Sequence, residues 1–287
     1  MVAGMNENKL NTKAVFDSYW KEVRKVLNLP TRERPGFIKA DAIRLLKNDW
    51  QTLDGKVIVD RLFKSLNQEF DGWKESPGKN WIWRSKHTKP LPNNHSQEVL
   101  LEHEIIELGG QRWTRQISTA SGVDKGLDGK RTRANRRRSI DLVYDQGDGG
   151  FSFVELKVGS DSPIYALFEI LGYGLAYWHS RQEKLSHRTA ASRLMQAAKI
   201  DLVFLGPESW YRDNPPGMAT ETQAALEALV EQLNLGLAGL TQGKPPMRLC
   251  YAKYPLANMN NAVVAACPAI EAVTLLAHQH NETPHES

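Results

Sequence analysis

The sequence predicts an α/β protein in two parts: a mainly helical N-terminal domain, residues 1–93, and a larger domain, residues 94–287, in which strands and helices alternate. Near residue 95 the apolar residues change from a spacing of three and four to a mixture of helical and alternating patterns. A run of strands, a long helix and another strand follow. The hydrophobic share of 41% and the charged share of 24% are those of a globular chain that buries a core.

The first part combines helices with many tryptophans. Its apolar spacing predicts helices at 14–27, 37–50 and 56–70 and a short strand at 80–84, before a proline-containing linker. Five of the eight tryptophans lie here. Helices followed by an aromatic strand are compatible with a winged-helix-like reader of DNA. A small helical cap with a tryptophan core is the favoured interpretation, because no recognition helix stands out.

The second part contains a hairpin between helices. Its turn is the Gly- and Asp-rich stretch 145–150, and Pro163 is suited to the first position of the helix that follows. The expected elements are a helix at 97–108, strands at 111–119, 139–144 and 151–158, a helix at 163–179, a strand at 200–205, a helix at 219–240 and a strand at 247–254.

Several protein classes are disfavoured. No apolar run approaches 18 residues, so we expect no membrane span. The polar start lacks the apolar stretch of a secretory signal, and two cysteines are too few for a disulfide framework, so a cytoplasmic location is expected. Neither the phosphate-binding loop of many ATPases nor the nucleophile elbow of hydrolases is present.

Positive charge is concentrated in one segment. Residues 124–138 hold seven basic and two acidic residues, a net charge of +5 in a chain whose total is +4. Such a local excess suits contact with phosphates, and a solvated loop is the alternative. The residues expected to bind nucleic acid are Lys130, Arg131, Arg133, Arg136, Arg137 and Arg138.

Three charged residues lie in otherwise apolar strands. Side chains alternate along a strand, so Glu155 and Lys157 point to one face, about 7 Å apart along the backbone. Asp141, in the preceding strand, reaches the same face across the hairpin. Two carboxylates brought together repel each other unless a cation lies between them, and hard oxygen ligands suit Mg²⁺ or Mn²⁺. Phosphodiester hydrolysis is the reaction that these groups suit, with Lys157 stabilising the transition state. The alternative is a salt bridge of Lys157 with either acid on an exposed sheet face.

The order of these elements resembles the core of the PD-(D/E)XK nuclease superfamily. The resemblance covers residues 95–207, with Asp141 at the motif's aspartate and Glu155-Leu156-Lys157 at its (D/E)XK, 14 residues later. Ile140 stands where the signature has proline. The resemblance implies a restriction-endonuclease-like αβββαβ core, a central mixed sheet flanked by helices, one or two Mg²⁺ ions, and cleavage of DNA or, less often, RNA.

Relatives also carry an acid on the first core helix. Glu98 fits this habit best and Glu102 is second; both lie on a helical face with Leu101 and Ile105. An ordinary glutamate that interacts with the helix dipole is the alternative for either.

Two further features of the sequence bear on the site. Glu169 and Tyr173 resemble the Gln-x-x-x-Tyr element of RecB-like members, with plain helix packing as the alternative. Asp201, in an echo of the Asp141 strand, is expected to begin a strand rather than to bind metal, because no Glu-x-Lys follows it.

These observations predict a Mg²⁺-dependent deoxyribonuclease, with Asp141, Glu155, Lys157 and Glu98 catalytic and the three acids holding Mg²⁺ or Mn²⁺. The expected partner is nucleic acid, DNA rather than RNA, with no membrane and with a homodimer as an alternative to a monomer. A nucleic-acid-binding or regulatory protein on an inactive nuclease-like scaffold is the alternative function.

Overall fold

A computed structural model describes residues 14–30, 53–71, 96–118, 139–158, 162–182, 193–207 and 219–254. Five α-helices and five strands lie in these ranges. They are α1 (Ala14–Val26), α3 (Gly55–Asp71), α4 (Gln97–Gly109), β1 (Trp113–Ser118), β2 (Ser139–Asp145), β3 (Gly150–Leu156), α5 (Pro163–Gln182), β4 (Lys199–Pro207), α7 (Ala219–Thr241) and β5 (Met247–Tyr254).

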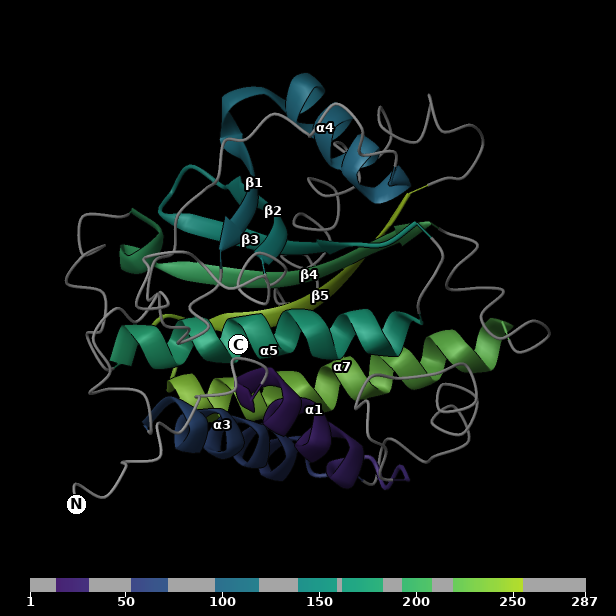
Figure 1. Ribbon diagram of the computed structural model, residues 1–287, viewed down its shortest axis with the longest axis vertical. Helices are drawn as coiled ribbons and strands as arrows, with labels where there is room; N and C mark the ends of the chain where they lie inside the picture. The colour runs from purple at the N-terminus through teal and green to yellow at the C-terminus, as the bar shows by residue number, and fades with distance from the viewer. Residues whose placement is uncertain are drawn as a thin grey trace, which may run out of the picture.

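The strands form one mixed sheet in which spatial order equals chain order, β1-β2-β3-β4-β5. The pairs β1–β2 and β2–β3 are antiparallel, whereas β3–β4 and β4–β5 are parallel. Helix α4 covers one face, α5 and α7 cover the other, and α1 and α3 lie beyond α5 and α7 (Figure 1). The α/β class and the mixed sheet are therefore confirmed.

Two hydrophobic cores lie on the two faces of the sheet. Along β3, Phe153 belongs to the core shared with α5, whereas its neighbours Val154 and Leu156 belong to the core under α4. Helix α5 is enclosed on nearly all sides, from Pro163 to Ser180, because it lies between the sheet and α1 with α3. This position explains why α5 lacks the polar stripe of a surface helix.

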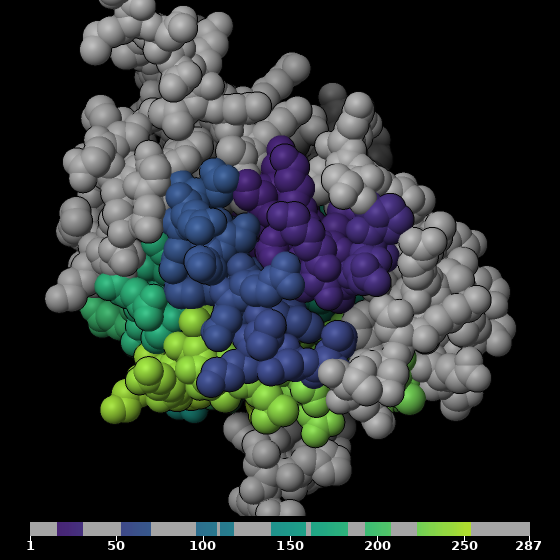
Figure 2. Space-filling model, turned by 90° about the horizontal axis from the view of Figure 1, so that it is seen from below, coloured from purple at the N-terminus to yellow at the C-terminus, as the bar shows by residue number. Residues whose placement is uncertain are grey.

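The described helices of residues 1–93 have no core of their own. The buried side chains of α1 and α3, Trp20 among them, belong to the same cluster as those of α5 and α7. On the face farthest from the sheet, α1 and α3 lie side by side (Figure 2). Glycines permit close helix contact here, since a Cβ added at Gly236 of α7 would overlap the Gly55 carbonyl of α3.

Every element expected within the described residues is present, with small changes at the ends. The strand expected from residue 111 begins at Trp113, because Gly110–Arg112 form a 3₁₀ turn in which Gly110 has a φ of 69°. Strand β3 ends at Leu156, so Lys157 follows the strand. The helix expected at 37–50 and the strand at 80–84 lie outside the described residues.

In the part of the chain that is described, no helix is both long enough and apolar enough to cross a membrane.

Candidate active site

The candidate site lies at one end of the sheet. Asp141 is near the start of β2 and Glu155 near the end of the antiparallel β3. Leu142 faces Val154 across these strands, so the next pair in register is Asp141 and Glu155. The parallel strands β4 and β5 end at the same edge. Ligands in open α/β sheets bind at such carboxyl ends.

Asp141 closes the end of the β2–β3 ladder with its side chain. Its Oδ2 accepts a hydrogen bond of 3.0 Å from the main-chain N–H of Leu156. Burial raises the pKa of Asp141 to about 7, with Glu169 and Glu98 adding to the rise while Lys157 and the Leu156 N–H oppose it. Burial is therefore the main cause of the rise, and Lys157 is the largest charge that acts on this carboxyl group.

Glu155 is 3% exposed, and the two oxygens of its carboxylate have different surroundings. Its Oε1 accepts a hydrogen bond of 2.6 Å from Lys157 Nζ. Its Oε2 is buried and finds no hydrogen-bond partner among the described residues. Burial raises the pKa of Glu155 well above its ordinary value, and the charges of Asp141 and Glu169 add to this. An enclosed carboxylate oxygen without a donor is a candidate ligand atom for a cation.

Lys157 joins the strands to α5. Its main-chain N–H donates to Leu205 O of β4 at 2.9 Å, and its Nζ lies 3.1 Å from Glu169 Oε2. The second contact is an ion pair by distance rather than an aligned hydrogen bond, since Glu169 Oε2 has no hydrogen bond among the described residues. Burial lowers the pKa of the Lys157 ammonium, but Glu155, Glu169 and Asp141 outweigh it and the pKa is raised.

The salt bridge that the sequence left open as an alternative is thus present between Lys157 and Glu155. It is not on an exposed face, because the two residues are 7% and 3% exposed. A buried pair of this kind is costly to assemble and is weak evidence for a purely stabilising role.

Both expected acids of α4 interact electrostatically with the acids of this site, and Glu102 is the more deeply buried of the two. Glu102 is buried, and each of its oxygens accepts from Gln116 Nε2 at 3.1 Å. Burial raises its pKa to about 8, and Asp141 is the largest charge adding to the rise. Glu98 is partly exposed and raises the pKa of both Glu102 and Asp141. The first choice from the sequence, Glu98, therefore lies at the rim and the second, Glu102, within the cluster.

Gln116 was not predicted and is part of the site. Register places it opposite Asp141, between the pairs Arg115–Leu142 and Ile117–Ile140, and its φ is 52°. It accepts a hydrogen bond of 2.7 Å from Ser139 Oγ while it donates to Glu102. Left-handed backbone at a residue other than glycine is strained and is frequent at functional sites. The sequence signal was a polar residue between two buried positions of a strand.

Glu169 and Tyr173 lie on α5 beside Lys157. The Tyr173 hydroxyl approaches Glu169 Oε1 at 3.4 Å, one turn away, while Glu169 reaches Lys157. The expected accessory pair therefore adjoins the site. The six expected basic residues at 130–138 lie outside the described residues.

Asp201 lies apart from this cluster. It pairs in register with Ser152, whose side chain is on the α4 face, opposite to that of Glu155. Its carboxylate contacts Gln146 Nε2 at 2.8 Å, Arg248 at 3.3 Å and Lys199 at 3.4 Å. A carboxylate neutralised in this way at the start of β4 matches the structural role expected for it.

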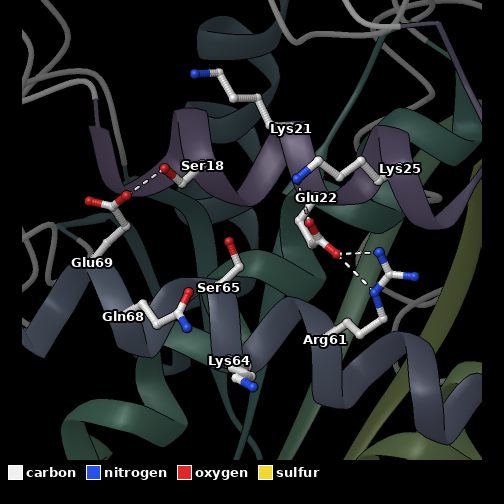
Figure 3. Close-up of a pocket in the computed structure, with 9 residues that line it drawn as sticks. All are labelled: Ser18, Lys21, Glu22, Lys25, Arg61, Lys64, Ser65, Gln68 and Glu69. Atoms are coloured by element: carbon white, nitrogen blue, oxygen red, sulfur yellow. Dashed lines mark hydrogen bonds and ion pairs between the residues drawn. The ribbon is translucent and has the colours of Figure 1, made fainter.

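A groove of about 420 Å³ between α1 and α3 is also distinct from the cluster. Part of its charge is paired locally: Arg61 and Lys25 both contact Glu22, and Ser18 donates to Glu69 (Figure 3). None of the carboxylates of the candidate site lines this groove.

The donor chemistry of the cluster fits a divalent cation such as Mg²⁺ or Mn²⁺. Carboxylate oxygens are the ligands these ions prefer, and Glu155 Oε2 is an enclosed donor without a hydrogen bond in the described structure. Asp141 and Glu155 would hold the ion. No group of three or more His, Cys, Asp or Glu side chains placed to bind a metal occurs in the described ranges. A third ligand would therefore require a shift of Glu102 or Glu98.

Comparison with known proteins gives no match to a family model, to a curated protein or to a solved structure.

Proposed function

We propose that the chain is a metal-dependent nuclease of the PD-(D/E)XK type that hydrolyses phosphodiester bonds, with DNA as the preferred substrate. One observation carries the proposal. Asp141, near the start of β2, and Glu155, near the end of β3, lie opposite each other, and Lys157 is bound to Glu155 inside the same enclosed cluster. The order α4-β1-β2-β3-α5-β4 around them is the αβββαβ order that the resemblance implies.

The burial of several carboxyl groups in one cluster supports a cation-dependent activity. Glu102, Asp141 and Glu155 all have raised pKa values, and burial is the first cause for each. A fold that served stability alone would gain by replacing such groups with apolar ones. Perturbed carboxyl groups that converge at the end of a sheet are instead characteristic of functional sites.

The residues of the chain divide the chemistry between them. A divalent ion, when bound, draws the phosphodiester in and lowers the pKa of a water molecule. Asp141 and Glu155 supply the negative charge that retains the ion. Lys157 offers a fixed ammonium to the charge that develops on the phosphate in the transition state. Glu169, at 3.1 Å, restrains that ammonium.

The basic segment supports nucleic acid as the substrate. The described chain resumes at Ser139, two residues before Asp141. Residues 130–138 are therefore joined to the sheet at the end that carries the carboxylates. Cationic side chains attached there suit a substrate with a phosphate backbone.

Cleavage assays test the proposal. Purified protein is incubated with single- and double-stranded DNA and RNA in Mg²⁺, Mn²⁺ or EDTA, and we expect cleavage only with metal. Glu155→Gln and Asp141→Asn should abolish cleavage. Asp141→Asn should keep or raise the melting temperature because it removes carboxylate repulsion, whereas Glu155→Gln also weakens the buried pair with Lys157 and should be less stable than Asp141→Asn. Asp201→Asn is the control, a buried aspartate at the start of β4, and should cleave normally. Full activity of both site variants at saturating Mg²⁺ would contradict the assignment.

A second candidate is a nucleic-acid-binding protein on an inactive nuclease-like scaffold. It is favoured by one observation: the described residues hold no preassembled group of three metal donors. Binding of nucleic acid in EDTA, together with no cleavage in Mg²⁺ or Mn²⁺, would favour this alternative.

A further inference from the structure

Helix α1 presents three aromatic side chains to α5. Phe16, Tyr19 and Trp20 are 3%, 0% and 4% exposed, and all belong to the core shared with α5. They come from the described part of the predicted N-terminal domain, for which the proposed nuclease chemistry has no role.

The α5 partners of these aromatics surround Glu169. The Trp20 ring stacks on Tyr165, with centroids 4.8 Å apart and planes at 3°. The Tyr19 hydroxyl donates to the Phe168 carbonyl at 2.6 Å. Phe16 meets the Tyr173 ring edge-on at 5.6 Å.

These contacts are spaced along one side of α5. Tyr165 lies one turn before Glu169, Phe168 lies immediately before it, and Tyr173 lies one turn after it. Positions four apart share a helix face, so the contacts restrain the turn of α5 that carries Glu169 from both directions.

The same α5 residues lead to Lys157. Glu169 Oε2 lies 3.1 Å from Lys157 Nζ, and the Tyr165 ring centroid lies 5.9 Å from that ammonium. Tyr173 approaches Glu169 at 3.4 Å. The contacts thus run from Trp20 through Tyr165, and from Phe16 through Tyr173, to the Lys157–Glu169 ion pair. Tyr19 instead holds the main-chain carbonyl of Phe168, the residue directly before Glu169.

A glycine brings the two helices close at this crossing. A Cβ added at Gly172 would lie 2.9 Å from Tyr19 Cε1 and 3.3 Å from Phe16 Cε1. Any larger residue would therefore separate α1 from α5 beside Glu169.

We infer that Phe16, Tyr19 and Trp20 are positioning residues of the active site, which hold α5 so that Glu169 keeps the Lys157 ammonium in place. The inference rests on the proposed nuclease function, and it gives the first helix a role in turnover. None of the three residues needs to touch the substrate.

The main test compares Tyr19 with a second buried tyrosine, whose hydroxyl contacts Leu194 and Arg181 instead of the turn of α5 that carries Glu169. Tyr177 of α5 also donates its hydroxyl to a carbonyl, Leu194 O, at 2.7 Å, on the side of α5 that faces the 3₁₀ turn Arg193–Gln196. Tyr19→Phe and Tyr177→Phe each remove one buried hydroxyl and keep the ring. We expect a fall in melting temperature for both variants, larger for Tyr177→Phe because it also loses the Arg181 contact, but a fall in kcat of about 10-fold with KM unchanged only for Tyr19→Phe.

A second readout needs no catalytic activity. Lys157 is 7% exposed, so an amine-reactive label followed by mass spectrometry should modify it slowly in the wild-type protein. Labelling should be several-fold faster in Tyr19→Phe and in Trp20→Leu, and unchanged in Tyr177→Phe. Trp20→Phe, which keeps a ring against Tyr165, should restore most of the protection.

Equal kcat and equal Lys157 labelling in Tyr19→Phe and Tyr177→Phe would overturn the inference. If the wild-type protein cleaves no nucleic acid, the proposed function fails, whereas the labelling comparison still decides whether α1 holds Lys157.

Discussion

Lys157 bears the positive charge that lies between Glu155 and Glu169, and its role is separable from that of the carboxylates. Because Asp141 and Glu155 are the proposed metal ligands, Lys157→Ala should retain metal binding, measured by titration calorimetry with Mn²⁺. Turnover should fall by about 10² or more if the ammonium stabilises the transition state. Normal cleavage by Lys157→Ala at saturating metal would show that Lys157 has only a structural role.

The same substitution should also destabilise the fold. Lys157→Ala leaves Glu155 and Glu169 without their cation, and removal of one partner of a buried pair costs about 3–5 kcal/mol. The loss should be smaller at about pH 5, because the raised pKa of Glu155 lets that carboxyl take up a proton. Denaturant unfolding at the two pH values measures this difference, with Lys157→Met as a control that keeps the side-chain volume.

The raised pKa values predict how the stability of the metal-free protein depends on pH. The folded state raises the pKa of Asp141 to about 7 and of Glu102 to about 8, above the values for the unfolded chain. The folded state therefore binds more protons, and this stabilisation, complete below about pH 4, is lost as the pH rises through about 7 and 8. We expect the melting temperature in EDTA to fall between about pH 5 and pH 8.

Added Mn²⁺ should restore much of the lost stability at about pH 8, because a bound cation replaces the protons. Glu102→Gln should flatten the pH dependence. A melting temperature that rises across this range in EDTA would contradict the assigned electrostatics.

At the scale of elements, the α3–α7 contact offers a matched pair of glycines. A Cβ added at Gly236 meets the Gly55 backbone and Val59, whereas at Gly239, one turn further along α7, it meets only the Lys56 side chain at 3.9 Å. Gly236→Ala should cost about 1–3 kcal/mol by overpacking. Gly239→Ala should gain about 0.5–1 kcal/mol, because alanine is the better helix former. Urea unfolding of both variants measures the contrast, and equal effects would contradict the close contact.

The helices and strands could be predicted from the sequence where burial gives the apolar residues a regular spacing. Strand β3 is buried throughout, so Glu155 is conspicuous among apolar residues. Lys157, just beyond the strand, was also visible for its charge. The choice between Glu98 and Glu102 was not predictable in this way, because both lie on one helix face. Their difference arises from Gln116, which reaches Glu102 from β1.

Other features depend on contacts that no local pattern carries. The left-handed backbone of Gln116 could not be predicted, because glutamine rarely adopts a positive φ. The attachment of α1 to α5 joins Tyr19 to Phe168, which are 149 residues apart in the sequence. The sequence therefore predicted α1 and α3 as helices, but not that their apolar faces share one core with α5 and α7.

For the molecule as a whole, the uneven charge predicts how nucleic acid binds. Replacing Lys130, Arg131 and Arg133 by Ala in the Glu155→Gln background should weaken binding to all sequences alike. The salt dependence should flatten by roughly 0.7–0.9 log units per log unit of salt for each phosphate that the variant no longer neutralises. Fluorescence anisotropy over a range of salt measures both.

The control makes the same change of charge elsewhere. Lys21, Lys25 and Lys64 are exposed lysines of α1 and α3, and their triple replacement by Ala should leave affinity and salt slope unchanged. Equal effects of the two triple variants would show that the basic segment has no particular role.

The strand order of the sheet also bears on how the chain folds as it is synthesised. Each strand pairs with its neighbour in the chain, so the sheet can grow in the order in which the strands leave the ribosome. Helices α1 and α3 are made before α5 and α7, yet their apolar faces pack on those two helices. At roughly 5–20 residues per second, Tyr19 waits about 7–30 seconds for Phe168. During that interval the aromatic face of α1 is exposed, and it is the part of the nascent chain that a chaperone would be expected to bind.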